Sequence, residues 1–132
     1  MESRNDVAAL VGRILLAVMF VLGGFGKIGG YDGTAAYMAS GGLPMIGVLL
    51  PLTILVELGG GLALVIGWKA RWVALVLAAF TLLASLLFHN FWTMTGAAMM
   101  TNQLLFMKNI AVIGGMLMVF AFGPGRFSVD RG

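Results

Sequence analysis

Five ionisable side chains could do chemistry in this chain because they lie within or beside long apolar runs. They are Arg13, Lys27, Glu57, His89 and Lys108. Glu57 lies in the middle of the apolar run from Leu52 to Gly67. An ionisable group at such a place costs several kcal/mol in a membrane unless it is paired, protonated or hydrated. Groups of this kind hold a counter-charge, relay a proton or bind a polar ligand.

The elements that must position these residues are membrane-spanning helices. The chain of 132 residues is 61% hydrophobic and only 10% charged, whereas a soluble domain carries about a quarter charged residues. The apolar runs show no two-residue alternation, which favours helices over a β-barrel. The sequence therefore predicts an all-α membrane protein, a bundle of four transmembrane helices.

Residues 1–132 are expected to form a single domain with spans at about 7–26, 44–67, 72–92 and 103–122. Each span offers roughly 20 residues, enough to cross a hydrocarbon core about 30 Å thick. Residues 27–43 are too polar to span, and they predict an interfacial or re-entrant segment with a short helix at 34–40. Residues 93–102, with Gly96 and several polar residues, predict a turn between the last two spans.

Basic residues predict the orientation in the bilayer. With four spans, one side of the membrane holds Arg4, Lys69, Arg71, Arg126 and Arg131, and the other holds only Lys27. The positive-inside rule then places both termini in the cytoplasm. The N-terminal stretch contains two acids and a long apolar run, so it is expected to stay as the first helix and not to be cleaved as a signal peptide.

The composition also excludes several kinds of site. The chain contains no cysteine, so it cannot form disulfides or hold an iron–sulfur cluster by itself. Its single histidine cannot make a bis-histidine haem site, and neither haem nor a metal is expected. No basic patch with interleaved aromatic residues is present, which argues against nucleic acid. The partner that the composition does require is the lipid bilayer.

Depth along the helices, at about 1.5 Å per residue, sorts the polar residues into two groups. Arg13 and Glu57 differ in depth by roughly 6 Å in the inner half, so a buried ion pair or proton relay is one expectation. The alternatives are that Arg13 reaches the interface and that Glu57 is only a structural partner. Candidates for ligand binding lie near the outer ends of their spans: Lys27, His89, Lys108, Asn109 and Gln103. His89 could equally be a hydrogen-bonded residue at a helix end.

Six short matches, in this order along the chain, resemble the DoxX family. They are GRILL at 12–16, GGFGK at 23–27, GLP at 42–44, ELGGGL at 57–62, His89 late in the third span, and FMKNIA at 106–111. The resemblance extends over about residues 7–122. It implies a small four-helix protein of the bacterial inner membrane, and some members are membrane subunits of thiosulfate:quinone oxidoreductase.

From the residues and this resemblance we expect a quinone-linked oxidoreductase subunit, with a quinone as cofactor and a redox partner subunit or a second copy as partner. Two alternatives stay open. The first is a non-catalytic binding or assembly module for a redox complex. The second is a small-molecule or lipid transporter whose polar centre binds an anion. Whether the chain is itself catalytic is left open by the sequence.

Overall fold

Helices make up all of the regular structure in the computed structural model, which describes residues 2–130. In chain order these are α1 (Glu2–Gly29), α2 (Tyr31–Ser40), α3 (Ile46–Ile54), a π-helical segment η1 (Leu55–Gly59), α4 (Gly60–Ile66), α5 (Ala70–Phe88), a short 3-10 turn η2 (Phe91–Thr93) and α6 (Gly96–Phe122). Four stretches are long and apolar enough to cross a membrane: Arg4–Gly29, Ile46–Ile66, Ala70–Thr93 and Gly96–Phe122. The predicted four-helix membrane bundle is confirmed.

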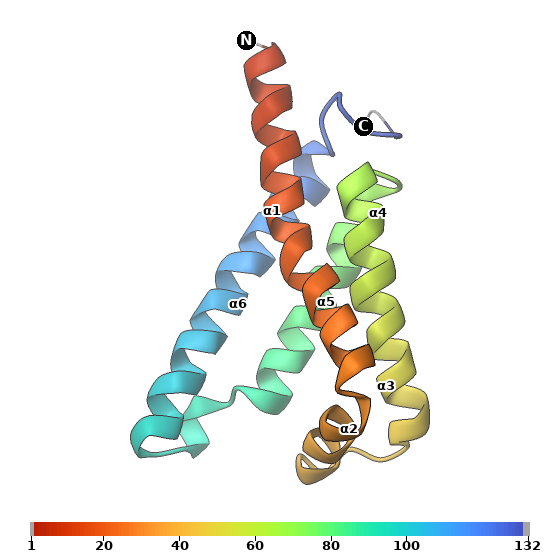
Figure 1. Ribbon diagram of the computed structural model, residues 1–132. Coiled ribbons are helices and arrows are strands. Elements are labelled where there is room, and N and C mark those ends of the chain that lie inside the picture. The colour runs from red at the N-terminus through yellow and green to blue at the C-terminus, as the bar shows by residue number, and fades with distance from the viewer. Residues whose placement is uncertain (1, 131–132) are drawn as a thin grey trace.

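The two ends of the chain lie at the same end of the bundle, beside the turn between α4 and α5, and α2 and η2 lie at the other end (Figure 1). This arrangement agrees with an even number of spans. The side of the membrane that each end faces stays a prediction, and Arg131 lies outside the described residues. Large apolar side chains such as Leu15, Leu104 and Phe122 project from the outward faces, as helices in contact with lipid require.

Several predicted boundaries change. The first helix extends to Gly29, the third begins at Ala70, and the last begins at Gly96 where the sequence predicted a turn through residue 102. Residues 97–100 are Ala, Ala, Met and Met, which all favour helix. The Asn102 side chain donates a 2.9 Å hydrogen bond to the Ala98 carbonyl inside the first turns. The polar residues near Asn102 therefore extend α6 instead of interrupting it.

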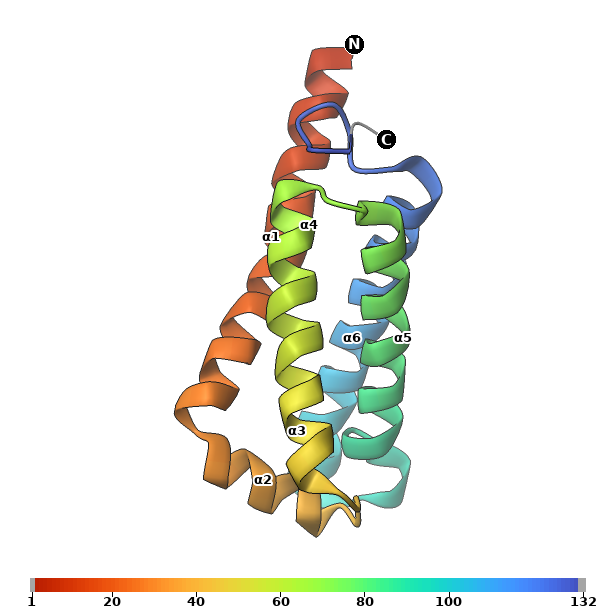
Figure 2. The ribbon, with the colours of Figure 1, turned by 90° about the vertical axis from the view of Figure 1, so that its right-hand side faces the viewer.

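The second span is assembled from three helical pieces, α3, η1 and α4, which run end to end (Figure 2). Pro51 lies within α3 and has no N–H to donate to the helix. The π-helical turn follows it directly and contains Glu57. A π turn inside an α-helix is uncommon and is frequently found at functional sites, because it changes the direction of the side chains around it.

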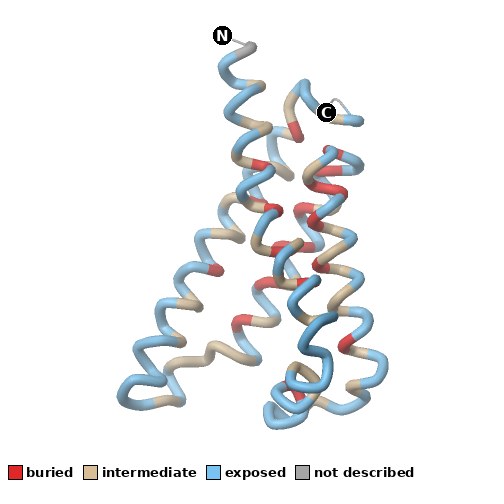
Figure 3. The backbone as a smooth tube through the Cα atoms, viewed as in Figure 1, coloured by how far each residue is buried: buried red, intermediate tan, exposed pale blue. Residues whose placement is uncertain are grey.

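Small residues let α1 approach the second span closely. A methyl group on Gly24 would lie 3.1 Å from the Leu58 backbone nitrogen, and one on Gly61 would lie 3.2 Å from that of Val21. Such contacts let helix backbones pack together in membranes. Buried residues concentrate where the helices meet, toward the end that holds the termini (Figure 3). The core cluster consists of Ala17, Phe20, Leu64, Ala70, Ala74, Leu77, Ala78 and Met116.

Candidate functional site

Glu57 and Lys27 form an ion pair inside the bundle. The Lys27 ammonium nitrogen lies 2.6 Å from Glu57 Oε1, and the side chains are 29% and 9% exposed respectively. Lys27 comes from the last turn of α1 and Glu57 from the π turn. Oε1 has no hydrogen bond of proper angular geometry within the described residues. The contact is therefore a short ion pair, and a carboxylate oxygen has more than one acceptor site, so Oε1 can also accept a hydrogen bond from a ligand.

A glycine makes room for this carboxylate. A methyl group on Gly23 would lie 2.8 Å from Glu57 Oε2 and 3.9 Å from the Lys27 nitrogen. Any larger residue at position 23 would displace the Glu57 side chain, since a contact of this length is below the van der Waals limit. The GGFGK sequence at 23–27 thus supplies both the space for the carboxylate and its counter-charge.

Arg13 has a different role from the one expected. It is only 1% exposed, and its Nη2 donates a 2.6 Å hydrogen bond to the Phe127 carbonyl of the C-terminal segment. The same segment is held by Val129 N–H to the Ile66 carbonyl at 3.0 Å, while the Ala70 N–H donates to the Asp130 carboxylate at 3.0 Å. Arg13 therefore fastens residues 127–130 to the end of the bundle, and the structure replaces the expected Arg13–Glu57 pair with Lys27–Glu57.

The helix register explains this correction. Gly23 lies against Glu57, Gly61 against Val21, and Gly67 against Arg13. Arg13 therefore lies ten residues from the position on α1 that faces Glu57, which is roughly 15 Å along the helix. An arginine side chain cannot span that separation.

His89 and Asn109 are each held by one polar partner. His89 Nδ1 lies 2.9 Å from Asn102 Oδ1. Because Asn102 Nδ2 donates to a backbone carbonyl, Oδ1 is the accepting atom and Nδ1 carries the hydrogen, which leaves Nε2 of a neutral ring as an acceptor. The buried Asn109 side chain donates to Ser85 Oγ at 2.8 Å. Sequence reasoning missed Asn102 because it placed that residue in a turn.

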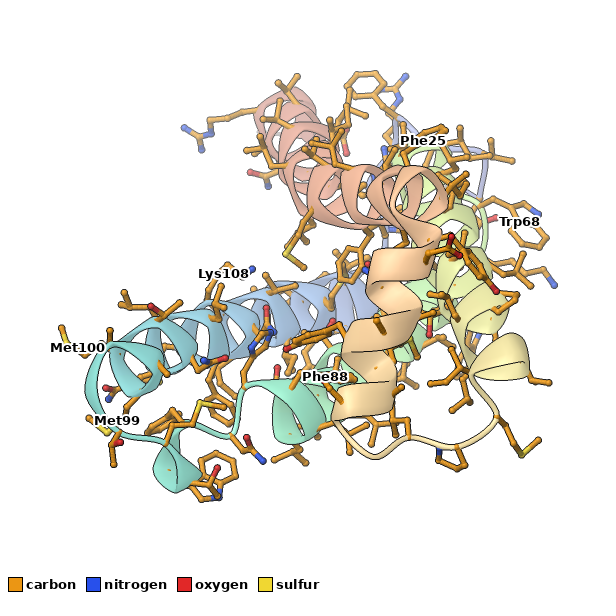
Figure 4. The ribbon with its side chains drawn as sticks, turned by 60° about the horizontal axis from the view of Figure 1, so that its bottom comes forward. Phe25, Trp68, Phe88, Met99, Met100 and Lys108 are labelled. Atoms are coloured by element: carbon orange, nitrogen blue, oxygen red, sulfur yellow. The ribbon has the colours of Figure 1, made fainter. Side chains whose placement is uncertain are left out.

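A cavity of about 500 Å³ brings most of the predicted residues together. Its polar lining includes Lys27, Glu57, His89, Lys108 and Asn109. Lys108 stands on the side of α6 that faces α1, across the space that Phe88 and α2 border (Figure 4). Gln103, which is exposed, and Arg13, which is buried, do not line this cavity. Glu57 thus belongs with the outer residues, whereas the sequence separated it from them by depth.

The rest of the cavity wall is apolar and aromatic. It includes Met19, Phe20, Met38, Leu49, Phe80, Leu83, Leu87 and Phe88, with Thr34 and Tyr37 from α2, Thr53 from α3 and Leu43 just before α3. Tyr37 stacks on Phe88 with ring centroids 5.1 Å apart. A volume in the range of about 300–1,000 Å³, an apolar wall and a few convergent polar groups are typical of small-molecule sites.

Fold and site together define a class: small helical membrane proteins that enclose a charged cavity in one half of a four-span bundle. Within that class the chain belongs to the DoxX family, whose model matches residues 8–90. The resemblance found in the sequence motifs is thereby confirmed.

Relatives are found in bacteria and in eukaryotes. The chain is 47% identical to inner membrane protein YqjF of Escherichia coli over 99% of this chain and 95% of that protein. It is 35% identical to inner membrane protein YphA of the same organism, over 96% and 91%. It is 24% identical to ER-derived vesicles protein ERV29 of Saccharomyces cerevisiae, over 99% of this chain but only 36% of that protein. No solved structure matches the chain.

Proposed function

We propose that this DoxX-family protein is a membrane subunit of a quinone-linked oxidoreductase, and that the quinone ring binds in the cavity between Lys27, Glu57, His89 and Lys108. One observation carries the proposal: the cavity of about 500 Å³ combines an apolar, aromatic wall with two ammonium groups, a carboxylate and an imidazole. An apolar ring with oxygen atoms at opposite edges matches such a lining.

The residues present fit a quinone on two further grounds. Glu57 Oε1 lacks a well-aligned hydrogen bond although it is buried, and His89 Nε2 is free of the bond that holds Nδ1. Both are acceptors for a ligand hydroxyl, whereas the Lys27 and Lys108 ammonium groups are donors for a carbonyl oxygen. The cavity therefore offers partners for the oxidised and the reduced form of the ring.

When bound, a quinone would supply redox chemistry that takes up two electrons and two protons. The chain's own residues would orient the ring against Phe80 and Phe88, exclude bulk water and hold protons at Glu57 and His89. Electrons would arrive from a donor or a partner subunit, since the cysteine-free sequence holds no iron–sulfur cluster of its own.

The proposed location is the bacterial inner membrane with both termini in the cytoplasm. The support is that YqjF and YphA are both named as inner membrane proteins, and that the end with both termini carries Arg4, Lys69 and Arg71. Basic residues collect on the cytoplasmic side of such proteins.

The test is purification in mild detergent, followed by organic extraction and mass spectrometry of the extract. Membranes with and without the protein are then compared for quinone reduction with thiosulfate and other donors. A quinone present in a fixed ratio to the protein, and donor-dependent turnover, are the expected results. Extracts free of quinone together with no protein-dependent turnover would refute the function.

A second candidate is a binding or assembly module in which the polar groups only specify helix packing. The close fit of Glu57 against Gly23 favours it, because that contact joins α1 to η1 whatever the cavity holds. Glu57→Gln separates the two functions. Loss of ligand with a loss of stability no larger than about 1 kcal/mol supports the oxidoreductase, and a larger loss of stability with ligand retained supports the module.

A further inference from the structure

Lys108 has no counter-charge in the part of the chain that the structure describes, although it lies near the middle of a membrane-spanning helix. It comes 12 residues after Gly96 and 14 before Phe122 in α6, which is roughly 18 Å and 21 Å from the two helix ends. The ion pair that the cavity contains joins Lys27 and Glu57. With His89 neutral, two ammonium groups and one carboxylate leave the cavity with one positive charge.

No acid besides Glu57 lines the cavity in the part of the chain that the structure describes. The five acids of the chain are Glu2, Asp6, Asp32, Glu57 and Asp130. Glu2, Asp6 and Asp130 belong to the end of the bundle that holds the termini, where Asp6 accepts a hydrogen bond from the Arg126 N–H and Asp130 one from the Ala70 N–H. Asp32 is exposed in the first turn of α2 and does not line the cavity. A second copy of the chain would bring the same set of acids.

We propose that the cavity binds its ligand as a monoanion, an amphiphile with an apolar body and one ionised oxygen acid, and that Lys108 is the counter-ion. This inference rests on the proposed function in that it uses the same cavity as a ligand site. It goes further because it states the charge of the ligand. Among quinones, the cavity would then bind ionised hydroxyquinones and quinol anions more tightly than neutral rings of similar shape.

Lys108 is exposed, but it lines the cavity at the depth of a membrane-spanning helix, and an unpaired ammonium group at that depth is costly unless an anion or water meets it. An anionic oxygen relieves that cost and forms a charge-assisted hydrogen bond, which is stronger than a bond to a neutral carbonyl. The apolar wall of Leu83, Leu87 and Phe88 holds the body of the ligand. Lys27 cannot serve as the counter-ion without giving up Glu57.

The test compares two probes that share one ring and one alkyl chain, a 2-hydroxy-3-alkyl-1,4-naphthoquinone that is ionised at neutral pH and its neutral 2-methoxy analogue. Dissociation constants are measured by calorimetry on the protein in nanodiscs of zwitterionic phosphatidylcholine, with empty nanodiscs subtracted. For the unaltered protein we expect the anion to bind at least about tenfold more tightly, the increment typical of a charged hydrogen bond.

Variants assign the preference to one side chain. Lys108→Gln should bring the two dissociation constants to within about twofold, and Lys108→Arg should keep the preference. The matched control is Arg71→Gln, which removes an exposed cation at the opposite end of α5 and should keep the preference as well.

The outcomes separate this inference from the proposed function. Equal binding of both probes to the unaltered protein, or tighter binding of the neutral one, refutes the inference that the ligand is an anion. It leaves the proposal that the cavity is a quinone site intact. Binding of neither probe refutes both. The comparison within the unaltered protein decides the question even if Lys108→Gln fails to fold.

Discussion

Breaking the Lys27–Glu57 ion pair from its two sides should give unequal losses of stability. The two groups meet at 2.6 Å but differ in burial, with Lys27 29% and Glu57 9% exposed. Lys27→Met leaves the buried carboxylate alone. Glu57→Gln leaves the ammonium group alone, but a lysine in the last turn of α1 can extend its flexible chain toward the membrane surface.

The expected magnitudes follow from this asymmetry. Removing one partner of a buried ion pair costs about 3–5 kcal/mol when the other remains trapped, so we expect about 3 kcal/mol for Lys27→Met. A partly exposed partner that can reach water loses much less, and about 1 kcal/mol is expected for Glu57→Gln. The double variant leaves no unpaired charge and should cost about 2 kcal/mol, roughly 2 kcal/mol less than the sum of the single variants.

The assay is unfolding by sodium dodecyl sulfate in mixed micelles, followed by far-ultraviolet circular dichroism, for the unaltered protein and the three variants. Trp92→Phe replaces an exposed tryptophan ring in η2, and it serves as a control for a change that removes no charge. If the double variant lost the sum of the single losses within about 0.5 kcal/mol, the two groups would be energetically independent. The same loss from both single variants would contradict the reasoning from burial.

Three further outcomes are expected. Gly24→Ala should reduce the free energy of unfolding by about 1–3 kcal/mol, because its methyl group would overlap the neighbouring helix; an unchanged value would show that α1 can shift. Asn109→Leu should cost about 1 kcal/mol through loss of its hydrogen bond to Ser85, measured in the same assay. Since the chain lacks cysteine, Ser40→Cys and Arg126→Cys report topology: an impermeant maleimide on intact cells should label only the former, and the reverse labelling would invert the orientation.

The number and type of the spanning helices could be predicted from the sequence, whereas several of their boundaries could not. Apolar runs of about 20 residues leave few alternatives to spanning helices. The start of α6 was misplaced because Thr101 and Asn102 look like turn residues, yet Asn102 bonds within its own helix and to His89. Composition alone does not distinguish a polar residue at a helix end, such as Asn102, from a polar residue in a loop.

The members of the candidate site were largely predictable, but the pairs among them were not. Lys27, Glu57, His89, Lys108 and Asn109 do line one cavity. The partner of Glu57 was missed because counting residues from estimated helix ends adds errors of a few residues from both helices, and each residue is worth about 1.5 Å. The packing of Gly23, Gly24 and Gly61 sets the true register, and a single sequence does not show which glycines face each other.

The π turn that contains Glu57 has a consequence for the coding sequence. A π turn holds one more residue than the α turn that could replace it, so deleting a single codon within residues 55–59 would allow an unbroken α-helix in the second span. Such a deletion would leave the span long enough for the bilayer, and the helical pieces on either side would keep nearly their present rotation, because the π turn already takes up the extra residue within one turn. Helix insertion and the faces that α3 and α4 present to α1 would survive this mutation, whereas the direction of the side chains within the turn, Glu57 among them, would change.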